Sequence, residues 1–214
     1  MTIHVVTDVK LEVEATLDTP ATVITAVTNA NPGVATATGH SFVDGDIIVL
    51  SVPNGMVELN AQVCRVANVV ADEFELEGID TTDMSAWVEG DATSVATWST
   101  LCQATGLSLG NAAPTELDAS NFCSKKTITL YGLAGAISGS IDVQHDAQLA
   151  AIQTLKAAKT DQLVAFRYTR QNGSTAVFGA VVSFSGGFDA TLNSIETATV
   201  AMTVPNEIVE YPAP

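Results

Sequence analysis

The sequence predicts a mainly β protein with a single flanking α-helix, and three observations support this fold class. Val, Thr, Ile and Ala dominate short runs that Gly, Asn and Asp interrupt, which is typical of all-β chains. The segments Lys10–Glu14 and Glu73–Glu77 alternate polar and apolar residues with the period of a half-buried strand, so we expect their carboxylates to stand in water. Only residues 146–159 (DAQLAAIQTLKAAK) repeat apolar residues at helical spacing.

Residues 21–92 are predicted to form a small β-barrel module of their own. Asp44-Gly45-Asp46 is a strong turn signal, because Gly and Asp suit the special backbone angles of turns. Short apolar runs begin at Ile47, Val63 and Phe74, and several short strands at this spacing favour a barrel. The module holds eleven acidic residues and one base, so −10 of the chain's net charge of −16 lies within it.

The remaining strands are predicted after residue 123, whereas residues 93–122 lack clear periodicity and are predicted to be a long connection. Strands are expected at Lys126–Tyr131, Ile137–Val143, Leu163–Arg170, Ala176–Phe184 and Thr197–Val204, with a hairpin turn at Asn172-Gly173.

Within the predicted helix, Leu149, Ile152 and Leu155 share one face. Asp146 at its start, and Lys156 and Lys159 at its end, complement the helix dipole. The ending Tyr211–Pro214 is expected to be a loose or partner-bound tail.

Composition and charge argue against several classes of function. Charged residues make up only 15% of the chain, which hints that part of its surface is covered by partners. A net charge of −16 argues against binding nucleic acid through its phosphates, since that requires clustered Lys and Arg. The N-terminus lacks the pattern of a secretion signal and no window approaches 18 unbroken apolar residues, so we expect no membrane insertion and a location in the cytoplasm. Three widely spaced cysteines without a C-x-x-C pair are expected to be free thiols.

The sequence offers no catalytic or metal-binding motif, and we predict no enzyme, no cofactor and no metal. The patterns of the nucleophile elbow, the dinucleotide loop and the phosphate loop are not met. The three histidines lie far apart, and Asp44-Gly45-Asp46 lacks the other ligands of a calcium loop. Trp87 and Trp98 are expected to close a small core, although aromatic rings can also stack on sugars.

An acidic surface is expected around the strand at Glu73–Glu77. Its candidate residues are Asp72, Glu73, Glu75, Glu77 and Asp80. A hydrolase with paired carboxylates is one alternative, but such enzymes need a cleft and one carboxyl whose pKa is raised by burial. A solvated strand face is the preferred interpretation.

Three stretches of the second half carry a resemblance to a known family: PTELDASNFCSKKTITLYGL, GAISGSIDVQHDAQLAAIQTLKAAKTDQLVAFRYTR and GAVVSFSGGFDATLNSIETATVAMTVPNEI. They combine a PTE-D lead-in, a Gly-Ser strand, one helix rich in Ala and Leu, and a Gly-Gly turn before a last strand of Thr and Val. In this order and chemistry, residues 114–211 resemble the tail tube proteins of long-tailed bacteriophages. The stretch GHSFVDGDIIVL looks like part of a small β-barrel repeat that is inserted in several phage structural proteins.

The resemblance implies a β-sandwich or barrel with one flanking helix, divided into a discontinuous core domain (1–20 and 93–214) and an inserted acidic barrel module (21–92) on the outer surface. It also implies a structural virion protein of the phage tail, assembled in the host cytoplasm, whose six-subunit rings stack into the conduit for genome delivery. The expected partners are other copies of the chain and the tape measure, tail terminator and tail-tip proteins. The alternative is a virion decoration or fibre module that binds host surface glycans.

DNA is expected to pass through the lumen without specific binding. Without the module's −10, the core domain carries −6, or six times that, −36, for a ring of six. A lumen of that sign would repel phosphates over about 8 Å at physiological salt.

Candidate subunit-interface residues are the cationic side chains that could pair with acids on an adjacent copy, the apolar face of the helix and the C-terminal tyrosine. They are Lys125, Lys126, Leu149, Ile152, Leu155, Arg167, Arg170 and Tyr211.

Overall fold

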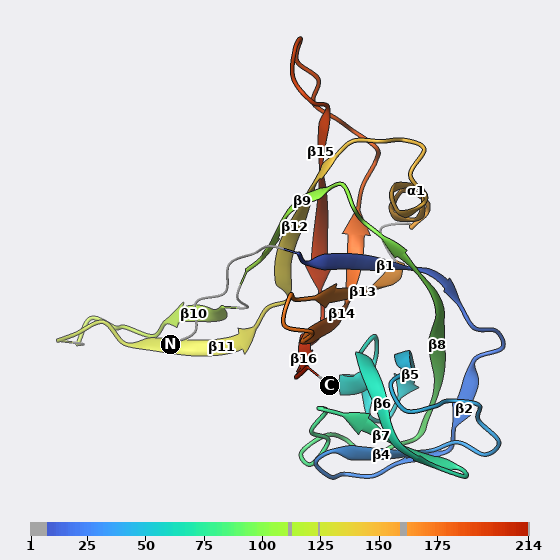
Figure 1. Ribbon diagram of the computed structural model, residues 1–214. Helices are drawn as coiled ribbons and strands as arrows, with labels where there is room; N and C mark the ends of the chain where they lie inside the picture. The colour runs from blue at the N-terminus through green and yellow to red at the C-terminus, as the bar shows by residue number, and fades with distance from the viewer. Residues whose placement is uncertain (1–7, 111–112, 124, 159–161, 214) are drawn as a thin grey trace.

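The computed structural model describes residues 8–110, 113–123, 125–158 and 162–213, which form a mainly β fold with one α-helix (Figure 1). The prediction of the fold class is therefore confirmed. The strands are β1 (Lys10–Leu17), β2 (Thr22–Ile24), β3 (Ala26–Val27), β4 (Gly33–Thr36), β5 (Ile47–Asn54), β6 (Val63–Val70), β7 (Glu73–Glu77), β8 (Glu89–Thr100), β9 (Ala104–Leu109), β10 (Pro114–Asp118), β11 (Thr129–Ala134), β12 (Ile137–Gln144), β13 (Leu163–Thr169), β14 (Thr175–Ser183), β15 (Thr197–Val204) and β16 (Val209–Tyr211). The helix α1 spans Ala150–Ala157, and a 3-10 turn, η1, spans Val57–Leu59.

Strands β2 to β7 and the first half of β8 close into a small barrel, which we call the N-terminal barrel. Its neighbours run in the order β3-β4-β7-β6-β5-β8, and β2 pairs with β8, so the short β2–β3 segment links the two ends of this path. The N–H of Thr25, between β2 and β3, donates to the carbonyl of Thr36 at 2.8 Å. Phe74, Leu76, Ile48 and Leu50 fill the interior. The turn residues Gly45 and Gly55 both adopt positive φ, as the turn signals predicted.

The second half of the fold is a curled sheet, which we call the large sheet, in the order β8-β1-β13-β14-β15-β12-β9. The helix packs Ala151, Ile152 and Leu155 against β1 and β8 on one side of it. Phe166 and Phe178 stack in its core with ring centroids 5.4 Å apart. The β13–β14 hairpin turns at Gly173, whose φ is +83°, as the Asn172-Gly173 signal predicted.

The barrel and the large sheet form one continuous sheet because β8 belongs to both. The first half of β8 pairs with β2 and β5, and the second half pairs with β1. Strand β16, which pairs with the start of β14, also places Val209 and Tyr211 in the barrel's hydrophobic cluster. The two parts therefore share both backbone hydrogen bonds and buried side chains.

A two-stranded hairpin of β10 and β11, which we call the arm, stands away from the large sheet and the barrel (Figure 1). All five residues of β10 are exposed, and no pairing joins the arm to the large sheet. The predicted long connection at residues 93–122 is therefore wrong: it contains most of β8, all of β9 and half of the arm. Small polar residues hide the alternation of these strands, which long-range pairing holds in place.

Strand β1 also differs from its prediction, because Glu12 and Glu14 are buried. Leu11–Glu14 are four consecutive buried residues, and successive side chains of a strand point to opposite faces, so both faces of β1 are covered here. The helix is confirmed but begins at Ala150, four residues later than predicted; the Asp146 carboxylate accepts a hydrogen bond from the N–H of Gln148 in the preceding turn. Lys156 lies in the last helical turn, whereas Lys159 lies outside the described residues. No described helix is long and apolar enough to cross a membrane.

Candidate functional site

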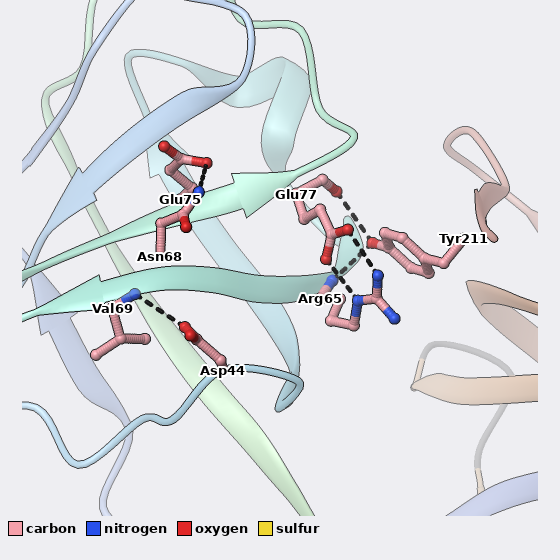
Figure 2. Close-up of polar contacts among 7 residues, drawn as sticks. All are labelled: Asp44, Arg65, Asn68, Val69, Glu75, Glu77 and Tyr211. Atoms are coloured by element: carbon pink, nitrogen blue, oxygen red, sulfur yellow. Dashed lines mark hydrogen bonds and ion pairs between the residues drawn. The ribbon is translucent and has the colours of Figure 1, made fainter. Parts of the chain in front are cut away.

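The predicted acidic residues lie on the outside of the barrel, where most of them have structural partners. Glu73 is exposed, and Glu75 accepts a hydrogen bond from the side-chain amide of Asn68 at 2.7 Å (Figure 2). The carboxylate of Asp72 accepts from the N–H of Gly39, and hydrogen bonds from Thr82 hold the pKa of Asp80 below its usual value. This arrangement matches a solvated strand face with local structural contacts. An exposed strand face is not the cleft in which a glycosidase places its two carboxyl groups.

The last residue of the acidic strand, Glu77, joins the C-terminal strand to the barrel (Figure 2). Its carboxylate makes a two-point ion pair with Arg65, with distances of 2.5 Å to Nε and 2.6 Å to Nη2. The Tyr211 hydroxyl accepts a hydrogen bond from the N–H of Arg65 at 2.7 Å and donates to the carbonyl of Glu77 at 3.0 Å. The Arg65 guanidinium also lies 4.2 Å from the centre of the Tyr211 ring. Tyr211 is thus a buried anchor within the chain, and its predicted place in a loose tail is wrong, whereas its role in a subunit interface stays a prediction.

The apolar helix residues that were predicted for an interface instead lie in the core of the chain. Ile152 and Leu155 are fully buried against the large sheet, and Leu149 is partly buried beside them. Ile152 and Leu155 have no exposed surface in the single chain, and their role at a subunit interface stays a prediction. The spacing of apolar residues along the helix corresponds to the packing of the helix on the sheet of its own chain.

Arg167 and Arg170, the other predicted interface cations, each form an ion pair inside the chain. Arg167 reaches the buried carboxylate of Glu12 at 2.7 Å and stacks on Trp98, 4.6 Å from the ring centre. Arg170 pairs with Glu210. Both side chains are only partly buried, so the contact with a neighbouring copy stays a prediction for them.

The arm carries an uncovered apolar surface that lies on regular secondary structure. Leu117 stands opposite Leu130 in the β10–β11 register, and Ala119 stands opposite Ile128. These four side chains share one face of the hairpin because residues two apart point the same way. Leu117 and Leu130 are 54% and 55% exposed, and nothing in the described chain covers them. Glu116, Asp118, Thr129 and Tyr131 form the opposite face.

The predicted interface residues Lys125 and Lys126 lie in the tip of this arm, and both are exposed. Phe122 in the same tip is fully exposed. Sequence reasoning found the two lysines but missed the hairpin that presents them. The signal was present, since apolar residues alternate at Leu117 and Ala119 and again at Ile128 and Leu130, but each run is only three residues long.

Two further apolar features lie at opposite ends of β14. At its C-terminal end, the loop of residues 185–196 exposes Phe188, Leu192 and Ile195. At its N-terminal end, a mainly apolar hollow of about 320 Å³ opens between β9, β1, β13 and β14. Leu107 and Phe178 are among its lining residues. The sequence had placed no function at either end.

Groups that might serve chemistry have structural partners instead. The carboxylate of Asp44 accepts a hydrogen bond from the N–H of Val69 (Figure 2). That of Asp46 accepts from the N–H of Val43, as in an ordinary acidic turn. His40 lies against Phe42 and Phe74, with ring centroids 5.4 and 5.2 Å away, as a core histidine does. Among the described residues, no group of three His, Cys, Asp or Glu side chains is arranged to hold a metal ion.

The tryptophans and cysteines follow their predictions. Trp87 and Trp98 pack against the barrel cluster, as expected for residues that close a small core. All three cysteines are free, with Cys64 buried and Cys102 and Cys123 exposed. Burial raises the pKa of the Cys64 thiol to about 12, so this cysteine is chemically inert in the folded chain.

The chain was compared with curated proteins and with models of protein families. No protein with curated annotation matches the chain. The model of a family described as "Phage tail tube protein, TTP" matches residues 54–213, about three quarters of the chain, from the middle of the barrel to the buried C-terminal strand. The chain belongs to the phage tail tube protein family and is a structural component of the virion.

Proposed function

We propose that copies of this chain form six-subunit rings that stack into the tail tube, and that the phage genome passes through the tube into the host. The observation that carries the proposal is the uncovered apolar face of the arm. A two-stranded hairpin alone is only marginally stable in water, so an arm of this kind needs a surface to lie on. In Figure 1 the arm points away from the body of its own chain, which favours the surface of a neighbouring copy.

The two ends of the large sheet support a second contact, between rings. The loop with Phe188, Leu192 and Ile195 leaves one end of β14, and the apolar hollow opens at the other end. A projection and a hollow at opposite ends of one subunit suit head-to-tail contacts, which repeat without closing and so build a filament. Strand β9 also has an unpaired outer edge, and pairing it with another copy would remove an aggregation-prone sheet edge.

We infer that the chain functions by assembling with other copies into a tube through which DNA passes, and that it is not an enzyme. The barrel is proposed as a module on the outer surface of the tube, and the terminator, tape measure and tail-tip proteins as partners at the tube's ends and in its lumen. The net charge of −16 disfavours attraction of DNA to the wall, which suits a conduit through which a genome slides.

Negative-stain electron microscopy of the purified protein tests the proposal. We expect closed rings or tubes that appear above a critical concentration, with or without a tail-tip nucleator. A chain that stays monomeric at high concentration in both conditions would contradict it.

A variant of the arm sharpens the test. Replacing Leu117 and Leu130 with serine should raise the critical concentration by about 100-fold or more, because burial of each leucine contributes roughly 1.5–3 kcal/mol. The monomer should keep its stability, since neither side chain contacts the rest of the chain. Val57→Ser is the matched control, because Val57 is similarly exposed but lies on the 3-10 turn η1 of the barrel, outside the arm. Assembly of the double variant at the wild-type concentration would refute the role of the arm.

A further inference from the structure

The tip of the arm carries two cations that the chain does not use for itself. Residues 119–134 contain Lys125 and Lys126 and no acidic residue. The other described cations have a partner within the chain: Lys10 and Arg167 with Glu12, Arg65 with Glu77, Arg170 with Glu210, and Lys156 over the Phe184 ring. Within the described part of the chain, Lys125 and Lys126 have no ion pair and no aromatic contact. They also lie on a hairpin that projects from the body of the chain (Figure 1).

The N-terminal barrel has the opposite excess of charge, because it carries carboxylates without cations. Of its eleven carboxylates, only Glu77 has a cation, since Arg65 is the sole base of residues 21–92. The others accept hydrogen bonds from neutral groups or face solvent, so their charge is not compensated within the described chain. Burying one side of this barrel against a neighbour therefore requires cations from that neighbour.

One face of the barrel combines this charge with exposed apolar side chains, and we call it the acidic face. It consists of Val43, Asp44, Val70, Asp72, Glu73 and Glu75. The hydrogen bond from the N–H of Val69 to Asp44 joins the loop of Val43 to β6, and Val70 pairs with Glu73 across the β6–β7 hairpin. Val43 and Val70 are 60% and 59% exposed. An apolar patch surrounded by carboxylates complements a hairpin that has an apolar face and a basic tip.

We propose that the arm of one copy docks on the acidic face of an adjacent copy, with Lys125 and Lys126 against the carboxylates of Asp72, Glu73 and Glu75. This inference rests on the proposed self-assembly and names the surface that receives the arm. The apolar side chains supply the contact area, and the charges set the register and the rate of association. Since the pairs lie at an exposed rim, their contribution falls as salt rises.

Charge reversal with rescue tests the pairing in the full-length chain. At low salt, K125E/K126E should raise the critical assembly concentration about tenfold, and E73K/E75K should do the same, because each places like charges in contact. The two pairs combined restore opposite charges and should return the value to within about threefold of wild type. K125R/K126R keeps the charge and is the matched control. At high salt the differences should shrink.

Cross-linking identifies the contact directly. Rings are assembled from a mixture of isotope-labelled and unlabelled chains and are treated with a carbodiimide, which joins an amine to a carboxylate in direct contact. We expect peptides that link Lys125 or Lys126 to Asp72, Glu73 or Glu75, with mixed labels that show two different copies. A second readout is the exposed Cys123 in the arm tip, whose rate of thiol labelling should fall on assembly.

The outcomes separate the inference from the proposed function. If the wild type forms rings but the reversed, rescued and conservative variants all assemble alike, the docking surface is wrong and the ring remains. Cross-links from the lysines to another part of the chain, or protection of Cys123 only when DNA is added, also overturn the inference. If the wild type forms no assembly at all, both proposals fail.

Discussion

Removing the hydroxyl of Tyr211 should weaken the joint between the C-terminal strand and the barrel. In Tyr211→Phe, the buried N–H of Arg65 loses its acceptor and the carbonyl of Glu77 loses its donor. Leaving a buried polar group unsatisfied costs roughly 1–3 kcal/mol, so we expect the free energy of unfolding to fall by about that amount. Tyr211→Ala also removes the buried ring, and the loss should reach about 3–5 kcal/mol.

Urea unfolding, followed by tryptophan fluorescence and by circular dichroism, measures this effect. Trp87 packs against the barrel cluster, and Trp98 packs against it from the half of β8 that pairs with β1. Fluorescence therefore reports the barrel and its joint with the large sheet, while circular dichroism reports all strands. For Tyr211→Ala, we expect the midpoint of the fluorescence transition to lie at a lower urea concentration than the midpoint of the circular dichroism transition, because the barrel loses its anchor to β16. Tyr131→Phe is the matched control: the same atom is removed from an exposed arm residue, and the change should stay within about 0.5 kcal/mol. A Tyr211→Phe variant as stable as this control would refute the reasoning.

Three other predictions concern the core. Burial raises the pKa of Glu14, so the folded state loses stability as pH rises through that pKa. Glu14→Gln should therefore increase the free energy of unfolding at pH 7, but not at a pH well below the ordinary glutamate pKa of about 4.5. Equal effects at both pH values in urea titrations would contradict this. Leu155→Ala should cost about 2–5 kcal/mol in the same assay, whereas an interface role without core packing would leave the monomer unchanged. A thiol reagent should modify Cys102 and Cys123 in the native monomer and Cys64 only after denaturation, and rapid reaction of all three would show that the barrel opens.

The parts of the fold that the sequence predicted well are those with strong local signals. The turn before the barrel strand at Ile47 and the turn at the end of that strand hold Gly45 and Gly55 at positive φ, which glycine adopts readily. The β13–β14 hairpin follows from Asn172-Gly173 in the same way. In each case, the residues that determine the structure are neighbours in the sequence.

The parts that the sequence missed depend on partners far away in the chain. Glu12 and Glu14 alternate with apolar residues as a surface strand would, yet both are buried. Glu12 pairs with the Arg167 guanidinium and Glu14 accepts a hydrogen bond from the N–H of Ala165, both about 150 residues later. Strand β9 is a strand because β12 pairs with it, since its own composition is mixed. Candidate interface residues were the hardest to choose from the sequence. The sequence shows which side chains are apolar or charged, but not which of them are covered by other parts of the same chain.

The arrangement of β1 and β8 bears on how this chain is synthesised. Leu17 pairs with Val95 just where the chain enters and leaves the barrel, so a finished barrel brings two segments nearly 80 residues apart into register. Because the ribosome releases the N-terminal part first, the barrel can hold β1 beside β8 before β13 has emerged. The remaining strands of the large sheet can then pair in turn, beginning with β13 on the exposed edge of β1.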